Sequence, residues 1–263
     1  MWKRIFIAAH VLRLRRGAPR AANTRWDTFW AGVQATGDGG DVLWDASSPA
    51  EAARYLDLLA DHADPTLPVV DIGCGNGRFT RALAARFPSA VGVDLSPAAI
   101  KRAEAESAGT PGVAFRVLDV TDPGAGALLR ADLGADVNVF VRGVLHVLDV
   151  PARRRMARGI GTLVGARGRV LISETNHRGN PLGYLEGLGA GPRGLPAALA
   201  RAVATGIPAP SAFGEAELDA CFPPGEWRRV LVDADAAITT IPLSTPSGHD
   251  KIPAFVAVLA PHG

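Results

Sequence analysis

Apolar runs and helical periodicities alternate through the middle of the chain. The run at residues 69–72 leads into a glycine-rich turn at 73–77, and from Arg78 apolar residues recur at helical spacing until Pro88 ends the helix. Similar short apolar runs follow at 90–94, 113–118, 137–141 and 169–173. Strands that alternate with helices in this way predict an α/β fold with a doubly wound, mostly parallel sheet.

The C-terminal part carries three more strand-like runs, at 230–234, 236–241 and 252–259, which we expect to complete the sheet. Between the fifth strand and these runs lies a long connection that starts rich in glycine and proline and continues with a helical piece near 195–203. A connection that leaves the carboxyl end of a strand lies on the ligand side of an open sheet. We therefore interpret residues 176–213 as a cap inserted after the fifth strand.

We interpret residues 1–47 as an N-terminal arm and aromatic cover that precede the main domain at 48–263. The arm, residues 1–20, is basic, and its apolar run Ile5–Ala9 is too short to span a membrane and has no convincing signal-peptide cleavage site after it. We expect a weakly ordered or amphipathic arm and no integral membrane segment. A peripheral membrane role for this arm is a further alternative.

Four aromatic residues follow the arm in a chain with only 6% aromatic content: Trp26, Phe29, Trp30 and Trp44. One interpretation is a helix that packs on the core. The other is a cover over the ligand site, since large apolar rings would exclude water from a reaction. The sequence leaves both interpretations open.

Composition fits one compact enzyme. A chain of 263 residues with 48% hydrophobic content can bury a full α/β core. The formal net charge is only +2, so the charge balance does not indicate a nucleic-acid partner. Two cysteines, Cys74 and Cys221, are too few for a disulfide framework, and a reducing cytoplasm is the default location.

The glycine-rich turn indicates a nucleotide-type ligand. Its spacing is G-x-G-x-G, and Asp71 before it would repel the diphosphate that G-x-G-x-x-G turns bind. A carboxylate suits a cationic, amino-bearing ligand such as S-adenosylmethionine. Asp94 lies about 20 residues after the glycines, where an acid can accept bonds from ribose hydroxyls. Asp119 ends the third run, and its carboxylate could accept a bond from an adenine amino group.

On these residues the chain resembles the class I S-adenosylmethionine-dependent methyltransferases of the small-molecule type, over roughly residues 50 to 175. The matching segments are Val69 to Gly77, Val91 to Ser96, Phe115 to Val120 and Val137 to His146. The resemblance implies a Rossmann-like, seven-stranded sheet whose last strand is antiparallel. It also implies S-adenosylmethionine as cofactor, S-adenosylhomocysteine as product, and no metal.

The resemblance assigns cofactor contacts residue by residue. Asp71 with Gly73, Gly75 and Gly77 would hold the methionine end. Asp94 would bind the ribose, and Asp119 with Val120 the adenine. Leu95 and Arg142 complete the expected cofactor-binding set.

Candidate catalytic residues follow strands four and five. His146 lies just beyond the fourth strand and is the expected general base or substrate contact, while Glu174 is a second catalytic candidate. The alternatives are a structural role for His146 and, for Glu174, a cap or an ion pair with Arg142. Trp30, His177 and Tyr184 are the expected substrate contacts, although His177 is equally consistent with a solvated position. No H-x-x-x-H pattern indicates a metal site.

The sequence therefore predicts methyl transfer from S-adenosylmethionine to a small, partly hydrophobic acceptor, such as a bacterial-type secondary metabolite. O-methylation is favoured, and N- or C-methylation stays open. The fourth strand is not followed by the N-P-P-Y tetrapeptide of enzymes that methylate nucleic-acid amino groups, because residues 141–144 read V-R-G-V. The alternative function is a fold relative that binds the cofactor but catalyses a non-methylating reaction such as cyclisation, or only binds a ligand.

Overall fold

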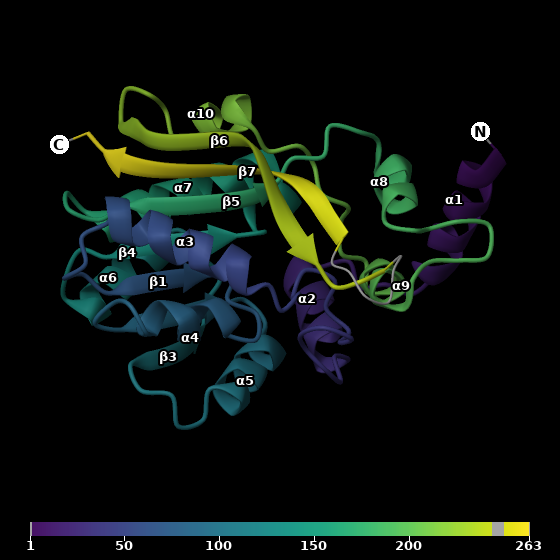
Figure 1. The fold of residues 1–263 in the computed structure, drawn as a ribbon, viewed down its shortest axis with the longest axis horizontal. Coiled ribbons are helices and arrows are strands. Elements are labelled where there is room, and N and C mark those ends of the chain that lie inside the picture. The colour runs from purple at the N-terminus through teal and green to yellow at the C-terminus, as the bar shows by residue number, and fades with distance from the viewer. Residues whose placement is uncertain (1, 244–249, 263) are drawn as a thin grey trace.

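The described part of the computed structural model, residues 2–243 and 250–262, contains one seven-stranded sheet of order β3-β2-β1-β4-β5-β7-β6 (Figure 1). The strands are β1 (Val69–Ile72), β2 (Ala90–Asp94), β3 (Val113–Val117), β4 (Asn138–Arg142), β5 (Val170–Thr175), β6 (Trp227–Thr240) and β7 (Asp250–Pro261). The first five strands pair in parallel, and β7 is antiparallel to both of its neighbours. The predicted doubly wound, mostly parallel sheet with an antiparallel last strand is confirmed.

Helices cover both faces of the sheet. On one face lie α3 (Pro49–His62), α4 (Arg78–Ala84) and α5 (Pro97–Glu106), and on the other α6 (Ala125–Leu133), α7 (Val150–Val164) and α10 (Glu215–Cys221). Alternate strand residues point to opposite faces, so Val69 packs with Tyr55 of α3, and Val70 packs with Met156 of α7. This two-sided burial explains why the strands β1, β2 and β4 are nearly continuous apolar runs.

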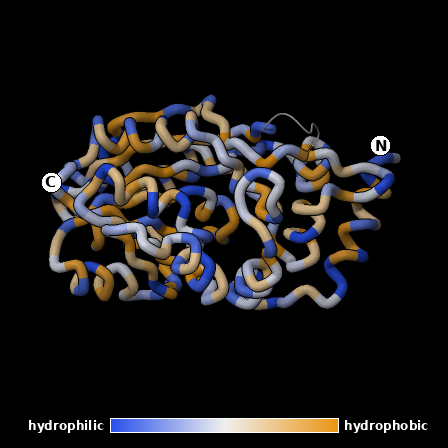
Figure 2. Tube along the Cα trace, turned by 60° about the horizontal axis from the view of Figure 1, so that its bottom comes forward, coloured by the Kyte–Doolittle hydropathy of each residue, from blue (hydrophilic) through white to orange (hydrophobic). Residues whose placement is uncertain are grey.

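A second lobe extends from the carboxyl ends of the parallel strands (Figures 1 and 2). It consists of α1 (Trp2–Leu14), α2 (Ala22–Ala31), α8 (Pro181–Gly187) and α9 (Ala197–Ala204). Helix α1 contacts α8 and α9, and α2 contacts α5. The predicted arm, cover and cap segments therefore lie together in space, although they are far apart in the sequence.

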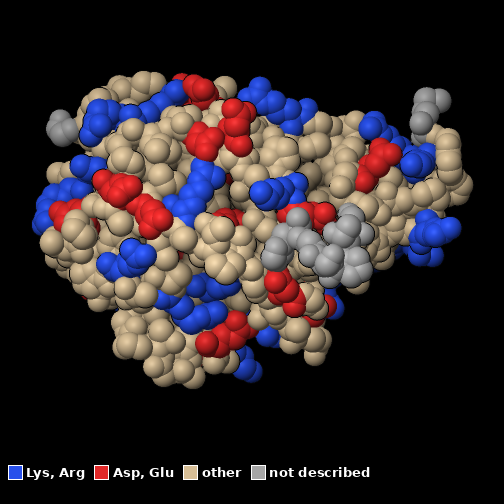
Figure 3. Space-filling model, viewed as in Figure 1, with Lys and Arg blue, Asp and Glu red and all other residues tan. Residues whose placement is uncertain are grey.

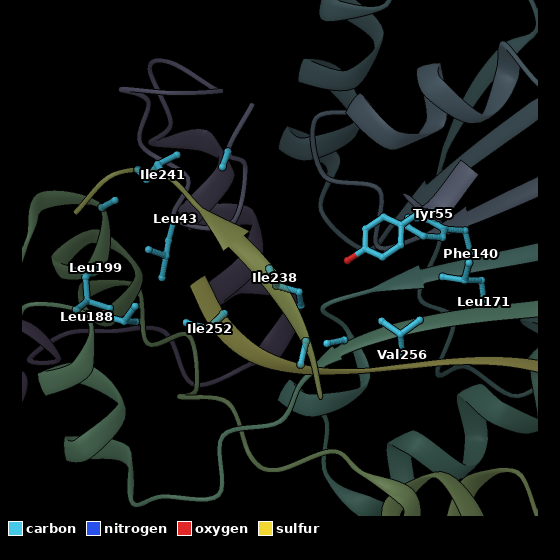
Figure 4. Packing of buried hydrophobic residues seen from close by; sticks show 14 of the residues in the cluster. Leu43, Tyr55, Phe140, Leu171, Leu188, Leu199, Ile238, Ile241, Ile252 and Val256 are labelled. Atoms are coloured by element: carbon cyan, nitrogen blue, oxygen red, sulfur yellow. The ribbon is translucent and has the colours of Figure 1, made fainter. Parts of the chain in front are cut away.

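The long hairpin β6–β7 joins this lobe to the sheet. The runs predicted separately at 230–234 and 236–241 form one strand, because two register shifts let β6 bend and stay paired with β7. Figure 4 shows Ile238 and Ile252 of this hairpin between Leu199 of the lobe and Tyr55 of the main domain. The hydrophobic core is therefore continuous from the α3 face of the sheet into the lobe.

Helix α8 was not expected from its glycine-rich sequence. Its start is nevertheless encoded locally, because the side chain of Asn180 accepts the backbone N–H of Gly183 at 2.8 Å and Pro181 occupies the first turn. The helix after β2 begins in the same way, with Ser96 as cap and Pro97 in the first turn. A polar cap followed by proline was the signal that could have identified α8.

Candidate functional site

A cavity of about 630 Å³ lies where the carboxyl ends of the parallel strands meet the second lobe. This volume is typical of sites for small molecules and cofactors. The sheet contributes Asp71, Asp94 and Asp119 to its walls, and the lobe contributes Trp30 and Tyr184. Most of the predicted cofactor residues and part of the predicted cover therefore line one space.

Two buried carboxylates at strand ends form the floor of the cavity. Asp71 in β1 accepts a hydrogen bond from the Thr80 hydroxyl at 2.6 Å, and burial raises its pKa to about 7. Asp94 at the end of β2 accepts the backbone N–H groups of Gly75 at 3.1 Å and Ser96 at 2.9 Å. Burial raises the pKa of Asp94 to about 6. A cation or several hydroxyl donors bound here would favour the ionised form of both acids.

The glycine turn has left-handed backbone at all three glycines, with φ of 74° at Gly73, 55° at Gly75 and 75° at Gly77. A Cβ added at Gly75 would lie 2.7 Å from Cζ2 of Trp30, so the cover helix packs directly on this turn. Gly73 and Gly75, two of the predicted cofactor contacts, line the cavity. Gly77 is not among the lining residues, because it begins α4 and packs against the Phe115 ring.

The loop after β3 offers one carboxylate oxygen to the cavity. Oδ1 of Asp119 accepts the backbone N–H and the hydroxyl of Thr121, at 2.8 and 2.7 Å. No described residue binds Oδ2, which leaves that oxygen as an acceptor for a ligand. Leu95 and Val120 line the cavity with Asp119 and supply the apolar surface expected around a base.

Arg142 lines the cavity but is held by a residue that the sequence did not indicate. Its Nε donates to Oε1 of Glu51 at 2.9 Å, and its Nη1 donates to the carbonyl of Trp44 at 3.1 Å. Glu51 also accepts the Tyr55 hydroxyl at 2.9 Å and the backbone N–H of Thr239 at 2.8 Å. Burial works to raise the pKa of Glu51, but Arg142 and the hydrogen bond from Thr239 lower it overall. The alternative pair between Arg142 and Glu174 is not formed.

The two candidate catalytic residues, His146 and Glu174, are in contact, which the sequence did not indicate. Nδ1 of His146 lies 2.6 Å from Oε2 of Glu174. The Glu174 carboxylate is fully buried and also accepts the backbone N–H groups of Val144, Leu145 and His146 at 2.9 to 3.1 Å. The backbone N–H of Thr175 also faces Nδ1, but at 3.4 Å, so the much shorter contact with a carboxylate that acts only as an acceptor assigns the proton to Nδ1. The second ring nitrogen, Nε2, has no partner among the described residues, and His146 lines the cavity.

A buried arginine connects the turn that carries His146, η1 (Leu145–Val147), to the end of the cap. Nε of Arg153 donates to the carbonyls of Leu145 at 2.7 Å and Leu148 at 3.1 Å. Its Nη2 donates to the Ser211 hydroxyl, which donates in turn to the carbonyl of His146 at 2.7 Å. The sequence did not indicate this connection, because 58 residues separate Arg153 from Ser211.

Two of the three expected substrate contacts line the cavity, and the third does not. Trp30 and Tyr184 line the cavity. His177 does not, and its ring instead packs edge-on against Tyr184 with 5.3 Å between centroids. The side-chain nitrogen Nε2 of His177 is buried without a hydrogen-bond partner among the described residues, so the alternative of a solvated His177 does not fit its position.

Each of the two interpretations of the aromatic cluster fits some of its members. Trp26, Trp30 and Trp44 line the cavity. Phe29 is fully buried behind them and stacks on Trp44 with 5.3 Å between ring centroids. The tryptophans of the cluster thus form a wall of the cavity, and Phe29 packs behind them in a small hydrophobic core.

The structure also bears on metal sites and on membrane-spanning helices. Within residues 2–243 and 250–262, no group of three or more His, Cys, Asp or Glu side chains is arranged to hold a metal ion. None of the helices described there is both long enough and apolar enough to cross a membrane.

Comparison with known proteins places these observations in context. Residues 69–168 match a family model described as a methyltransferase domain. A trans-aconitate 2-methyltransferase of Methylobacterium nodulans is 46% identical over 84 residues, which are 27% of this chain and 31% of that protein. A ubiquinone biosynthesis O-methyltransferase of Ralstonia nicotianae is 34% identical over 149 residues, which are 54% of this chain and 59% of that protein.

The chain thus matches about a third and about three fifths of the length of these two curated relatives. A solved structure of a methyltransferase from Anabaena variabilis, described as S-adenosylmethionine-dependent, matches over more of the chain. Its TM-score is 0.80 at 24% sequence identity, and the match covers 93% of this chain and 97% of the other. This likeness confirms the fold.

Proposed function

Since this chain contains a class I S-adenosylmethionine-dependent methyltransferase domain, we propose that the whole protein transfers a methyl group to a small, partly apolar acceptor and releases S-adenosylhomocysteine. One observation carries the proposal. The carboxylates of Asp71 and Asp94, the free oxygen of Asp119 and the free ring nitrogen of His146 all belong to one cavity. Groups suited to the cofactor and a group suited to the acceptor are therefore next to each other.

The described residues fit S-adenosylmethionine. Asp71, buried beside the glycine turn with a raised pKa, would bind the ammonium group of the methionine end. Asp94 would accept the ribose hydroxyls, since its two oxygens have each used one lone pair on a backbone N–H. Oδ2 of Asp119 would accept the adenine amino group, with Leu95 and Val120 against the ring. The bound cofactor supplies an electrophilic methyl group on a sulfonium.

The protein then has to position an acceptor atom and remove its proton. The Glu174 carboxylate holds the Nδ1 proton of His146 and orients the ring, so Nε2 presents a lone pair to the cavity. A group of this kind accelerates proton removal from a hydroxyl in contact with it. Because an acceptor hydroxyl benefits from such a base, the pair supports O-methylation. The Ralstonia relative is named as an O-methyltransferase, which supports the same choice.

The remaining walls suggest the character of the acceptor. They are apolar near the lobe, where Leu199, Val203 and Ile252 line the cavity with the aromatic cluster. A hydroxylated small molecule with an apolar body, such as a bacterial-type secondary metabolite, fits such walls. A cavity of about 630 Å³ with walls of this kind suits a small molecule better than a nucleic-acid strand.

The proposal is tested by an acceptor screen. Purified protein and S-adenosylmethionine would be incubated with phenols, carboxylic acids, amines and isoprenoids, and the products analysed by mass spectrometry. The proposal expects an acceptor whose mass rises by one methylene unit at an oxygen atom. Conversion of an acceptor without this mass change would favour the alternative of a non-methylating reaction.

A further inference from the structure

Helix α1 exposes an apolar stripe. Trp2, Ile5, Phe6 and Leu12 are between 48% and 70% exposed, and they are four of the eight large hydrophobic side chains that are exposed in the described chain. The spacing of these residues places them on one side of the helix. The opposite side attaches α1 to the lobe, because Ile7 is fully buried there. The stripe has no partner among the described residues.

The stripe is accompanied by positive charge. Residues 1–20 contain six basic residues and no Asp or Glu: Lys3, Arg4, Arg13, Arg15, Arg16 and Arg20. Of these, only Arg4 forms an ion pair with a described residue, with Glu186 of α8 at 3.0 Å. Helical spacing places Arg13 on the exposed side with the stripe, and Arg16 is exposed in the turn that follows the helix. Figure 3 shows basic side chains among uncharged ones at this end of the molecule.

We propose that α1 binds to the surface of an anionic membrane. The apolar stripe would enter the boundary between headgroups and acyl chains, and the unpaired arginines would contact lipid phosphates. Trp2 is well suited to that boundary, because tryptophan is enriched at membrane interfaces. A second copy of this chain is the less favourable occupant, since a stripe packed on itself would bring two sets of arginines together without acidic partners.

Binding of this kind would have a consequence for the cavity. Val11 of α1 and Arg15, in the turn that follows the helix, line it. A protein attached through α1 would hold this wall of the cavity close to the bilayer, where an acceptor with an apolar body is concentrated. This consequence rests on the proposed function, whereas membrane binding itself does not.

The test is co-sedimentation of the full chain with sucrose-loaded vesicles, in the absence of cofactor and acceptor. We expect binding to vesicles of phosphatidylcholine with phosphatidylglycerol, much weaker binding to pure phosphatidylcholine, and loss of binding as salt is raised. The double variant Ile5→Glu/Leu12→Glu should reduce the bound fraction at least tenfold. Leu128→Glu is the matched control, because Leu128 is also more than half exposed but lies on α6.

Several results would overturn the proposal. These are no binding to the anionic vesicles, equal binding by the double variant, and equal loss in the Leu128→Glu control. The oligomeric state, measured by light scattering without lipid, provides one more such result. If the original protein is a dimer and the double variant is a monomer, the stripe binds a second copy of the chain. Since no step requires methyl transfer, failure here would leave the proposed function untouched.

Discussion

Nδ1 of His146 donates to Oε2 of Glu174 across 2.6 Å, and Glu174 is fully buried. The same carboxylate accepts three backbone N–H groups from the turn that carries His146. Glu174 thus fixes the turn, the ring and the position of the proton together. The ring nitrogen that remains for chemistry is Nε2, on a residue that lines the cavity.

Removal of this nitrogen tests its role. His146→Ala should lower kcat for a hydroxyl acceptor by about 100- to 10,000-fold, the usual range for loss of a general base. The affinity for S-adenosylhomocysteine, measured by calorimetry, should hardly change, because Asp71, Asp94 and Asp119 are intact. Full activity in His146→Ala would remove His146 from the mechanism. A loss of cofactor affinity instead would show that the ring contacts the cofactor.

Arg153 should control the position of the His146 turn. Arg153→Met would leave the carbonyls of Leu145 and Leu148 without their buried donor, and lost hydrogen bonds of this kind cost about 1 to 3 kcal/mol. We expect a lower melting temperature and a kcat reduced more strongly than the cofactor affinity. Arg154→Met is the matched control, since Arg154 is the exposed neighbour on the same helix. Equal kinetic effects in both variants would contradict a specific role for Arg153.

Cofactor affinity should depend on pH through the two buried acids. In the free protein, burial raises the pKa of Asp71 to about 7 and that of Asp94 to about 6. A bound ammonium group and ribose favour the carboxylates, so binding at lower pH must release protons. The affinity for S-adenosylhomocysteine should therefore be constant well above pH 7 and weaken as pH falls through 7 and then 6. Each acid can weaken the affinity by at most about tenfold per pH unit.

Calorimetry in two buffers of different ionisation enthalpy measures this proton release directly. Asp71→Asn serves as the control, because it should bind more weakly and lose the dependence near pH 7. An affinity that stays constant between pH 5.5 and 8 would contradict the assignment of both acids to the cofactor.

The aromatic cluster offers a pair of variants with opposite expectations. Phe29 is fully buried. Phe29→Ala should therefore lower the free energy of unfolding of the surrounding region by about 3 to 5 kcal/mol. Trp26 is half-buried and lines the cavity, so Trp26→Ala should reduce turnover more than stability. Denaturant titration and initial rates measure the two effects. The reverse result would mean that Trp26 belongs to the core and Phe29 to the ligand site.

The parts of this molecule that could be predicted from sequence are those fixed by local chemistry. The glycine turn, the acids at strand ends and His146 after β4 follow from short segments in which each residue's role depends on its immediate neighbours. The order of the sheet then brings Asp71, Asp94 and Asp119 to one edge. For this reason the residues at the cofactor side of the cavity could be named from the sequence, whereas the contact between His146 and Glu174 could not.

The remaining parts depend on contacts between distant segments. Glu51 and Arg142 meet across 91 residues, and neither has a local pattern that indicates the other. The close approach of Trp30 to Gly75 depends on how the second lobe docks on the sheet. His177 was expected at the cavity because it follows β5, but the chain turns after Thr175 and directs its ring onto Tyr184. Local spacing carries no information about such turns.

The most direct test of the central claim is the stoichiometry between acceptor conversion and cofactor cleavage. Purified protein would be incubated with S-adenosylmethionine carrying a deuterated methyl group and with an acceptor found by screening. Product and S-adenosylhomocysteine would then be quantified together by mass spectrometry. Our account predicts one S-adenosylhomocysteine per product, with the deuterated methyl on an acceptor oxygen. Product that forms without the label, and without S-adenosylhomocysteine, would contradict it.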